Sequence, residues 1–218
     1  MDHRPLSAQQ RPGPGDPQRE VSLGRDLLDR IHALLKSLQA PRLDPFLAEW
    51  PGEAPSRRVT PTSLPVLKYN SVLGSKTPPW ARSVTDELFR LAPSLHWAQS
   101  YPASAVGAWF LENYGWTEVA GLHGPIPGEH VAIGFLMLGP ATLYPRHRHE
   151  AKEIYVPVSG TAAWQGGDGI WRNKPPGDVI VHESDEPHAM RTSSEPLLAL
   201  YLWRSAQLDQ KSRLDPAS

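Results

Sequence analysis

The chain of 218 residues contains no cysteine. Disulfide bonds are therefore excluded, and so are thiolate ligands for zinc or for an iron–sulfur cluster. Neither sign of charge is in excess, because 22 basic and 23 acidic side chains leave a net charge of −1. This balance gives no reason to expect binding to nucleic acid or to an anionic membrane.

Long apolar runs are also missing. No segment has the roughly 18 continuous apolar residues that a membrane span needs, and no apolar run follows a basic start as in a signal peptide. We therefore expect a soluble cytoplasmic protein. Proline, glycine and tryptophan, in contrast, are plentiful, with 24, 17 and 8 residues, which suits a β structure with many turns and long connections.

The first half of the chain shows helical periodicity after a polar start. Residues 1–19 are rich in Pro, Gly, Gln and Arg and predict a disordered tail. Leucines recur at helical spacing over 20–39, which predicts an amphipathic helix that packs on the rest of the protein or on a second subunit in a homodimer. We expect further helices over 84–92, with Ser83 as the N-cap, and over 103–113.

From about residue 117 the periodicity changes to that of β-strands. Short apolar or alternating runs are separated by turn residues, including a glycine-rich hairpin turn at 166–169. The expected strands are 131–138, 143–149, 153–158, 161–165, 170–172, 178–182, 188–192 and 197–203. The pattern predicts a small antiparallel barrel or double-sheet jelly roll over 117–210, after a helical part over 20–116 and before a C-terminal tail over 211–218.

Side chains that bind transition metals gather on these strands. His147 and His149 alternate on one strand and therefore share a face, as Glu153 and Tyr155 do on the next. A third histidine, His188, follows on a later strand. Three imidazoles and a carboxylate form a ligand set for one divalent transition metal, and the set suits iron, manganese, zinc, cobalt or nickel without choosing among them.

The spacing of these residues resembles that of the cupin superfamily. The run from His147 through His149 and Glu153 to Gly160 is similar to the first cupin motif. A Gly-Asp turn followed by a Pro-His pair that ends at His188 is similar to the second motif. The resemblance implies a cupin barrel, although cupins host many chemistries.

A finer resemblance is to the cupin-type dimethylsulfoniopropionate (DMSP) lyases, particularly their DddL-like branch. In that family a tyrosine follows the metal-binding glutamate by two positions, as Tyr155 does here, and another precedes the first histidine by three, as Tyr144 does. A tryptophan lies on the last barrel strand, as Trp203 does. The resemblance covers roughly residues 80–205.

This resemblance implies a β-elimination that splits DMSP into dimethyl sulfide, acrylate and a proton. A metal bound to the substrate carboxylate would stabilise the developing charge, and Tyr155 would be the general base, because the metal and the sulfonium both favour phenolate. Tyr144 would bind the carboxylate or support Tyr155. Trp203, with Tyr201, would hold the sulfonium by a cation–π contact, and packing alone is an equally open role for Trp203.

Two other functions are compatible with the same residues. An iron-dependent cupin dioxygenase would use the same four ligands with oxygen as cosubstrate, and it has no special need for Tyr155. A non-enzymatic cupin sensor or sugar-binding module could keep a structural metal. The histidines outside the motifs have no spacing that recruits them, and we interpret them as structural or surface residues.

Overall fold

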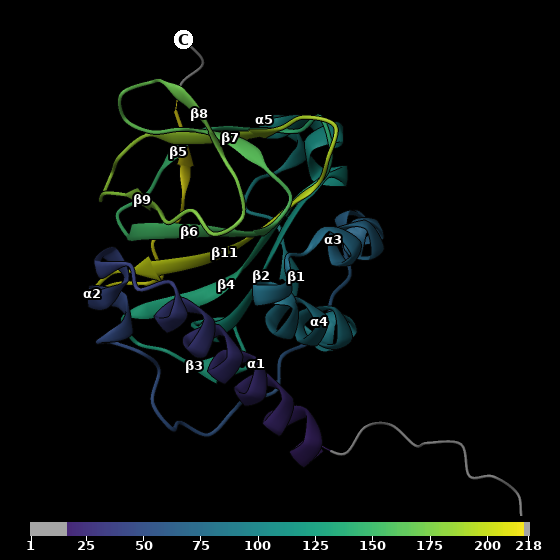
Figure 1. The fold of residues 1–218 in the computed structure, drawn as a ribbon, viewed down its shortest axis with the longest axis vertical. Coiled ribbons are helices and arrows are strands. Elements are labelled where there is room, and N and C mark those ends of the chain that lie inside the picture. Colours follow the sequence, from purple (N-terminus) through teal and green to yellow (C-terminus); the bar gives the residue numbers. More distant parts are fainter. Residues whose placement is uncertain (1–16, 216–218) are drawn as a thin grey trace, which may run out of the picture.

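The computed structural model describes residues 17–215, with side chains from residue 24 onward. Within this range two sheets face each other, and helices cover the outer face of the larger one (Figure 1). Residues 1–16 of the expected N-terminal tail lie outside the described residues. The amphipathic helix α1 (Pro17–Ser37) begins before the expected start at residue 20.

Helices and 3-10 turns make up most of the chain before residue 113. The bounds are α1 (Pro17–Ser37), η1 (Pro41–Leu43), α2 (Asp44–Leu47), η2 (Pro65–Tyr69), α3 (Asn70–Lys76), η3 (Pro79–Ala81), α4 (Arg82–Leu91), η4 (Ala92–Ser94) and α5 (Ala103–Glu112). Each of the 3-10 turns has proline at its first or second position, where the missing N–H is not needed and φ is already suitable.

The prediction that Ser83 caps the helix over 84–92 is wrong. Because η3 leads directly into α4, the helix begins at Arg82 with Ala81 at the N-cap, and no side chain caps it. Ser83 therefore lies inside the first turn. The helix expected over 103–113 is α5, and its last helical residue is Glu112.

The larger sheet has the strand order β1-β2-β4-β11-β6-β9, with β3 paired to β2. Its strands are β1 (Trp97–Ala98), β2 (Tyr114–Gly121), β3 (Ile126–Pro127), β4 (Val131–Leu138), β6 (Lys152–Ser159), β9 (Ile180–His182) and β11 (Leu197–Arg204). The smaller sheet has the order β12-β5-β10-β7-β8. Its strands are β5 (Leu143–Arg148), β7 (Ala162–Gln165), β8 (Trp171–Lys174), β10 (His188–Thr192) and β12 (Arg213–Leu214).

The last strand lies where the sequence predicted a C-terminal tail. β12 pairs with β5, and Asp215 follows it directly. The carboxylate of Asp215 accepts a hydrogen bond from Arg148 at 2.6 Å and lies 3.4 Å from Arg146. These contacts attach the end of the chain to the smaller sheet, so residues 211–215 are part of the folded structure.

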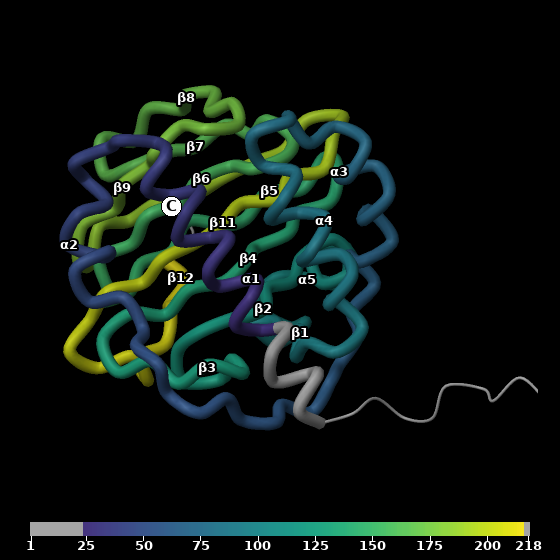
Figure 2. Tube along the Cα trace, turned by 60° about the horizontal axis from the view of Figure 1, so that its bottom comes forward, coloured from purple at the N-terminus to yellow at the C-terminus, as the bar shows by residue number. Residues whose placement is uncertain are grey.

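The larger sheet is buried on both faces because successive side chains of a strand point to opposite sides. On β11, Leu198, Leu200 and Leu202 join the core beneath the helices, whereas Ala199 and Tyr201 face the smaller sheet. This double burial explains why β4 and β11 are apolar along most of their length. The leucine stripe of α1 belongs to the same outer core, so the helix covers this sheet (Figures 1 and 2).

The structure confirms the expected fold class of mainly β structure with N-terminal helices. The helices and the larger sheet share one hydrophobic core, and the division into two parts near residue 116 stays a prediction. Among the described helices, none combines the length and the hydropathy that a membrane span requires.

Candidate metal centre and active site

The predicted histidines lie on neighbouring strands of the smaller sheet. His147 on β5 is paired directly with His188 on β10, and His149 follows the end of β5. All three side chains are buried, and one ring nitrogen of each lies within 4.8 Å of the others. The structure therefore brings together three imidazoles that come from two separate sequence motifs.

Local backbone contacts set the orientation of each imidazole. The Nδ1 atoms of His147, His149 and His188 lie 2.8, 2.9 and 2.8 Å from a backbone carbonyl oxygen two residues away in the chain. A carbonyl can only accept, so each Nδ1 carries a proton, and Nε2 is the nitrogen that has the lone pair whenever the ring is neutral. This is the tautomer in which a histidine binds a metal through Nε2.

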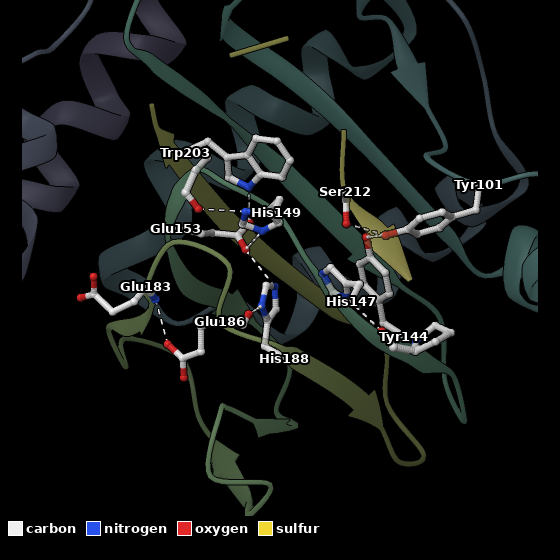
Figure 3. A network of polar contacts seen from close by, with 12 residues as sticks. Tyr101, Tyr144, His147, His149, Glu153, Glu183, Glu186, His188, Trp203 and Ser212 are labelled. Atoms are coloured by element: carbon white, nitrogen blue, oxygen red, sulfur yellow. Dashed lines mark hydrogen bonds and ion pairs between the residues drawn. The ribbon is translucent and has the colours of Figure 1, made fainter. Parts of the chain in front are cut away.

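Glu153 reaches the same point from β6 of the opposite sheet (Figure 3). Its Oε2 lies 3.0 Å from His149 Nε2 and 3.2 Å from His188 Nε2. The other oxygen, Oε1, accepts a hydrogen bond of 2.5 Å from the indole N–H of Trp203. The side chain is fully buried, so its charge needs compensation by partners of this kind.

The electrostatics of the cluster favour the ionised carboxylate of Glu153 and the neutral form of His147. Burial opposes ionisation of Glu153, but His149 and His188 outweigh it and hold the pKa of the carboxyl well below its usual range. Burial, assisted by His188, holds the pKa of His147 well below its usual range and keeps it neutral. His188 Nε2 is a buried nitrogen without a hydrogen bond to any described residue. The buried histidine triad thus fits a transition-metal site.

Tyr155 lies beside this cluster on β6, two residues after Glu153. Only 4% of the residue is exposed, and it lines a cavity of about 520 Å³ whose walls include Glu153, Trp203 and Tyr144 but none of the three clustered histidines. Burial raises the pKa of Tyr155 well above its usual range, and the nearby Glu153 carboxylate raises it further. The position agrees with the expected face of the strand, whereas the surroundings favour the neutral phenol until positive charge is added.

Tyr144 stacks on His147, with ring centroids 4.1 Å apart. Its hydroxyl lies 3.3 Å from the hydroxyl of Tyr114 and 3.4 Å from that of Tyr101, and Tyr101 continues to Ser212 at 2.6 Å (Figure 3). Tyr101 and Tyr114 were not among the residues that sequence reasoning selected, because they lie in the helical half and at the start of a strand that the pattern did not reveal.

Trp203 and Tyr201 lie on β11 and line the same cavity. The indole of Trp203 packs on His149 with ring centroids 4.2 Å apart, in addition to its hydrogen bond to Glu153. Trp203 therefore touches the histidine–glutamate cluster as well as the cavity. Tyr201 is 8% exposed and is paired with Tyr155 on β6.

His182 was interpreted as structural, and the structure places it against the cluster. It is paired with Glu153 in the β6–β9 ladder, and its ring stacks on His188 at 4.0 Å. Both ring nitrogens are buried without a hydrogen bond to any described residue. Its position at the end of a short β9 gave no signal in the sequence, since neither cupin-like motif includes it.

Comparison with known proteins agrees with the function that the site geometry indicates. A family model described as DMSP lyase matches residues 43–199. The chain belongs to this family. It is 29% identical over 180 residues to the DMSP lyase DddQ of Ruegeria pomeroyi, with 83% of this chain and 88% of DddQ covered. It is 31% identical over 122 residues to a protein of Cereibacter sphaeroides described as a candidate DMSP lyase, DddL, but spans about half the length of that protein, with 55% of this chain covered.

Solved structures of DMSP lyases share the fold. A structure from a study of the DMSP lyases RdDddP and RnDddQII superposes with a TM-score of 0.77 at 26% identity, covering 90% of this chain and 100% of that one. The structure of DddQ from Ruegeria pomeroyi superposes with a TM-score of 0.76 at 27% identity, covering 88% and 96%. The expected resemblance to cupin-type DMSP lyases is thereby confirmed.

Proposed function

We propose that this protein cleaves DMSP by β-elimination into dimethyl sulfide, acrylate and a proton. The observation that carries the proposal is the position of Tyr155: a phenol on the wall of a 520 Å³ cavity, two residues from a carboxylate that joins three buried imidazoles. The membership in the DMSP lyase family supports the substrate. The protein is a carbon–sulfur lyase in this proposal.

His147, His149, His188 and Glu153 would hold one divalent transition metal, which, when bound, supplies a Lewis acid for the substrate carboxylate and makes the adjacent carbon more acidic. Iron, manganese, zinc, cobalt and nickel all accept such a set of imidazole and carboxylate ligands. The support from this chain is the uniform Nδ1–carbonyl contact, which leaves three Nε2 atoms directed to one place.

Tyr155 acts as the general base. Its phenolate takes a proton from the carbon next to the carboxylate, the electron pair of that bond forms the double bond of acrylate, and the carbon–sulfur pair leaves with sulfur as neutral dimethyl sulfide. Burial and the Glu153 charge raise the pKa of Tyr155, so ionisation needs nearby positive charge. The sulfonium of the substrate supplies part of it, which ties formation of the base to substrate binding.

Tyr144 and the aromatic wall position the substrate. Burial raises the pKa of Tyr144 well above its usual range, so its hydroxyl stays protonated and can donate a hydrogen bond to the substrate carboxylate. Trp203 and Tyr201 present aromatic rings to the cavity, and such rings attract a desolvated cation by about 0.5–2 kcal/mol.

The test is an assay of the purified, metal-loaded protein with DMSP under anaerobic conditions. We expect dimethyl sulfide in the headspace by gas chromatography and an equal amount of acrylate by liquid chromatography. A chelator should stop the reaction, and restored metal should recover it. Turnover only with oxygen uptake would favour a dioxygenase, and binding without any product would favour a sensor.

A further inference from the structure

A second buried carboxylate faces the same cavity. Glu118 on β2 is 7% exposed and lines the cavity together with Tyr201 and Trp203. It is paired with Gly134 on β4, which is paired with Tyr201 on β11, which is paired with Tyr155 on β6. These four residues form one row across the sheet, and their side chains point to the same face.

Gly134, which lies between Glu118 and Tyr201 in this row, leaves room for the side chains of both. A Cβ on Gly134 would lie 2.6 Å from the hydroxyl of Tyr201 and 2.1 Å from the carbonyl oxygen of Thr117. The Tyr201 side chain therefore extends over β4 toward β2, into space that any other residue at position 134 would close. As a result, Glu118 and Tyr201 approach each other across β4.

The Glu118 carboxylate is held by backbone donors at one oxygen. Its Oε1 accepts hydrogen bonds from the backbone N–H of His123, in a short contact, and from that of Gly124 at 2.8 Å. Both hydrogen bonds described for the carboxylate end on Oε1, which leaves Oε2 without a described hydrogen bond in a residue that lines the cavity. A preorganised carboxylate of this kind suits a cation.

Arg57 fixes the loop that provides these donors. Its guanidinium donates to the carbonyl oxygens of Gly124 at 2.7 Å and Gly121 at 2.8 Å. These contacts direct the Arg57 guanidinium to backbone oxygens, so the arginine supports the loop. Burial raises the pKa of Glu118, while the charge of Arg57 acts on that carboxyl from nearby and lowers its pKa in part. A cation bound beside the carboxylate would offset the cost of burial further.

The Glu118 carboxyl lies near the row of the sheet that contains Trp203 and Glu153. A Cβ on Gly121 would lie 2.7 Å from the Glu118 carboxyl carbon and 2.8 Å from Ala132 Cβ, so the carboxyl lies close to Ala132. Ala132, Trp203 and Glu153 form the next row of the sheet. Neighbouring strands are about 4.8 Å apart, which places the backbones at Ala132 and Glu153 roughly 10 Å apart with Trp203 between them.

We infer that Glu118 is the anionic contact for the cationic end of the substrate, while the cluster around Glu153 takes its carboxylate end. The inference rests on the proposed function, because it assigns the two ends of the same cavity to the two charges of DMSP. Glu118 and the indole of Trp203 together would enclose the sulfonium. The ligand class is a carboxylate with a sulfonium or quaternary ammonium group two methylenes away.

The chemistry predicts which kinetic constant depends on Glu118. The positive charge on sulfur disappears as the carbon–sulfur bond breaks, so the carboxylate binds the substrate more strongly than it binds the transition state. Removing its charge should therefore raise KM and leave kcat unchanged or slightly higher. Dimethyl sulfide is neutral and is not retained by Glu118, which favours release of the product.

The test compares two unreactive ligands of the same shape: 3-(trimethylammonio)propionate and its isostere 4,4-dimethylpentanoate, which keeps the carboxylate and has a neutral carbon in place of the cationic nitrogen. Dissociation constants are measured by calorimetry on the metal-loaded protein. Glu118→Gln keeps an Oε1 acceptor for the backbone donors and removes the charge. We expect it to weaken the ammonium acid by about 10- to 100-fold and to change the isostere by less than about 2-fold. In turnover of DMSP, KM should rise while kcat is retained.

Glu129→Gln is the matched control, because it makes the same substitution at an exposed residue outside the cavity lining. It should leave both dissociation constants unchanged. An equal loss for both ligands, or no loss, in Glu118→Gln would overturn the inference. If that variant does not fold, the wild-type protein decides, since equal affinity for the two ligands would also overturn it. These binding results do not depend on turnover, whereas absence of dimethyl sulfide from the wild-type assay would refute the proposed function itself.

Discussion

The two sheets contribute to the candidate site in different ways. The smaller sheet supplies three imidazoles, and each is oriented by a carbonyl oxygen only two residues away. The larger sheet supplies Glu153, Tyr155, Tyr201 and Glu118, whose relative positions depend on the pairing of β2, β4, β11 and β6. The metal end is thus determined by local contacts, and the substrate end by the register of strands far apart in the chain.

The difference predicts how the two sides respond to mutation. Loss of an imidazole should remove the metal while the larger sheet keeps its register. Loss of the Tyr155 hydroxyl, of Tyr201 or of the Glu118 charge on the larger sheet should alter binding or catalysis while the metal stays. The predictions below test this separation.

The largest effect is expected for His188→Ala. The variant removes one Nε2 from the triad, and we expect loss of at least about 100-fold in metal affinity and loss of nearly all activity. Elemental analysis after dialysis measures the metal, and circular dichroism checks the fold. His96→Ala, which changes a histidine outside the cavity, should keep full metal. Full metal occupancy in His188→Ala would show that the ligand set is misassigned.

Metal binding should also stabilise the folded protein. A metal at 100 times its dissociation constant adds about 2.7 kcal/mol to the free energy of unfolding, which raises Tm by roughly 5–10 °C in a chain of this size. A chelator should reverse the shift. His188→Ala should show little shift at any pH, and an equal shift in that variant would place the metal elsewhere.

The size of this shift should depend on pH. Burial lowers the pKa of His149, but the charge and hydrogen bond of Glu153 outweigh burial, and the pKa is raised. A metal needs the neutral imidazole. The stabilisation by metal is therefore fully present above the pKa of His149 and is lost as the pH falls through it. Thermal melts with and without metal across the acid range measure this; a metal-induced shift that grows on acidification would contradict the account.

A smaller effect is expected for substitutions of Trp203, which packs on His149 and donates a hydrogen bond to Glu153. Trp203→Leu should weaken binding of cationic DMSP by about 2- to 30-fold more than binding of acrylate, because the cation–π contact is lost. Trp203→Phe keeps an aromatic ring and removes the N–H that bonds to Glu153. Trp203→Phe should keep more of the preference for the cation than Trp203→Leu does. It should lower metal affinity, because Glu153 loses its hydrogen bond from the indole. Equal losses for both ligands in Trp203→Leu would leave packing as its role.

The contrast between local contacts and long-range strand pairing explains which site residues the sequence could predict. Strand alternation places His147 with His149, and Glu153 with Tyr155, because all four lie within nine residues and obey a period of two. The register that joins Glu118 to Tyr201 depends on strands separated by about eighty residues, and no local pattern contains it. Tyr101 and Tyr114 were missed because one lies in the helical half and the other begins a strand that the local pattern did not reveal.

Local signals also failed where neighbouring elements competed. Ser83 has the chemistry of an N-cap, but the proline-led turn η3 passes directly into α4 and starts the helix at Arg82. Residues 213–214 look like a polar tail in the sequence, yet the edge of β5 offers them a partner, and Asp215 binds the arginines of that strand. Tertiary contacts decided both outcomes.

The central claim is that the larger sheet supplies the base independently of the metal, and Tyr155→Phe tests it most directly. The variant keeps the ring and deletes the hydroxyl. Measured on one sample for metal content and for kcat with DMSP, it should retain full metal and lose about 10²- to 10⁴-fold in kcat, whereas Tyr69→Phe, outside the cavity, should match wild type in both. A Tyr155→Phe protein with full metal and near-normal kcat would contradict the account.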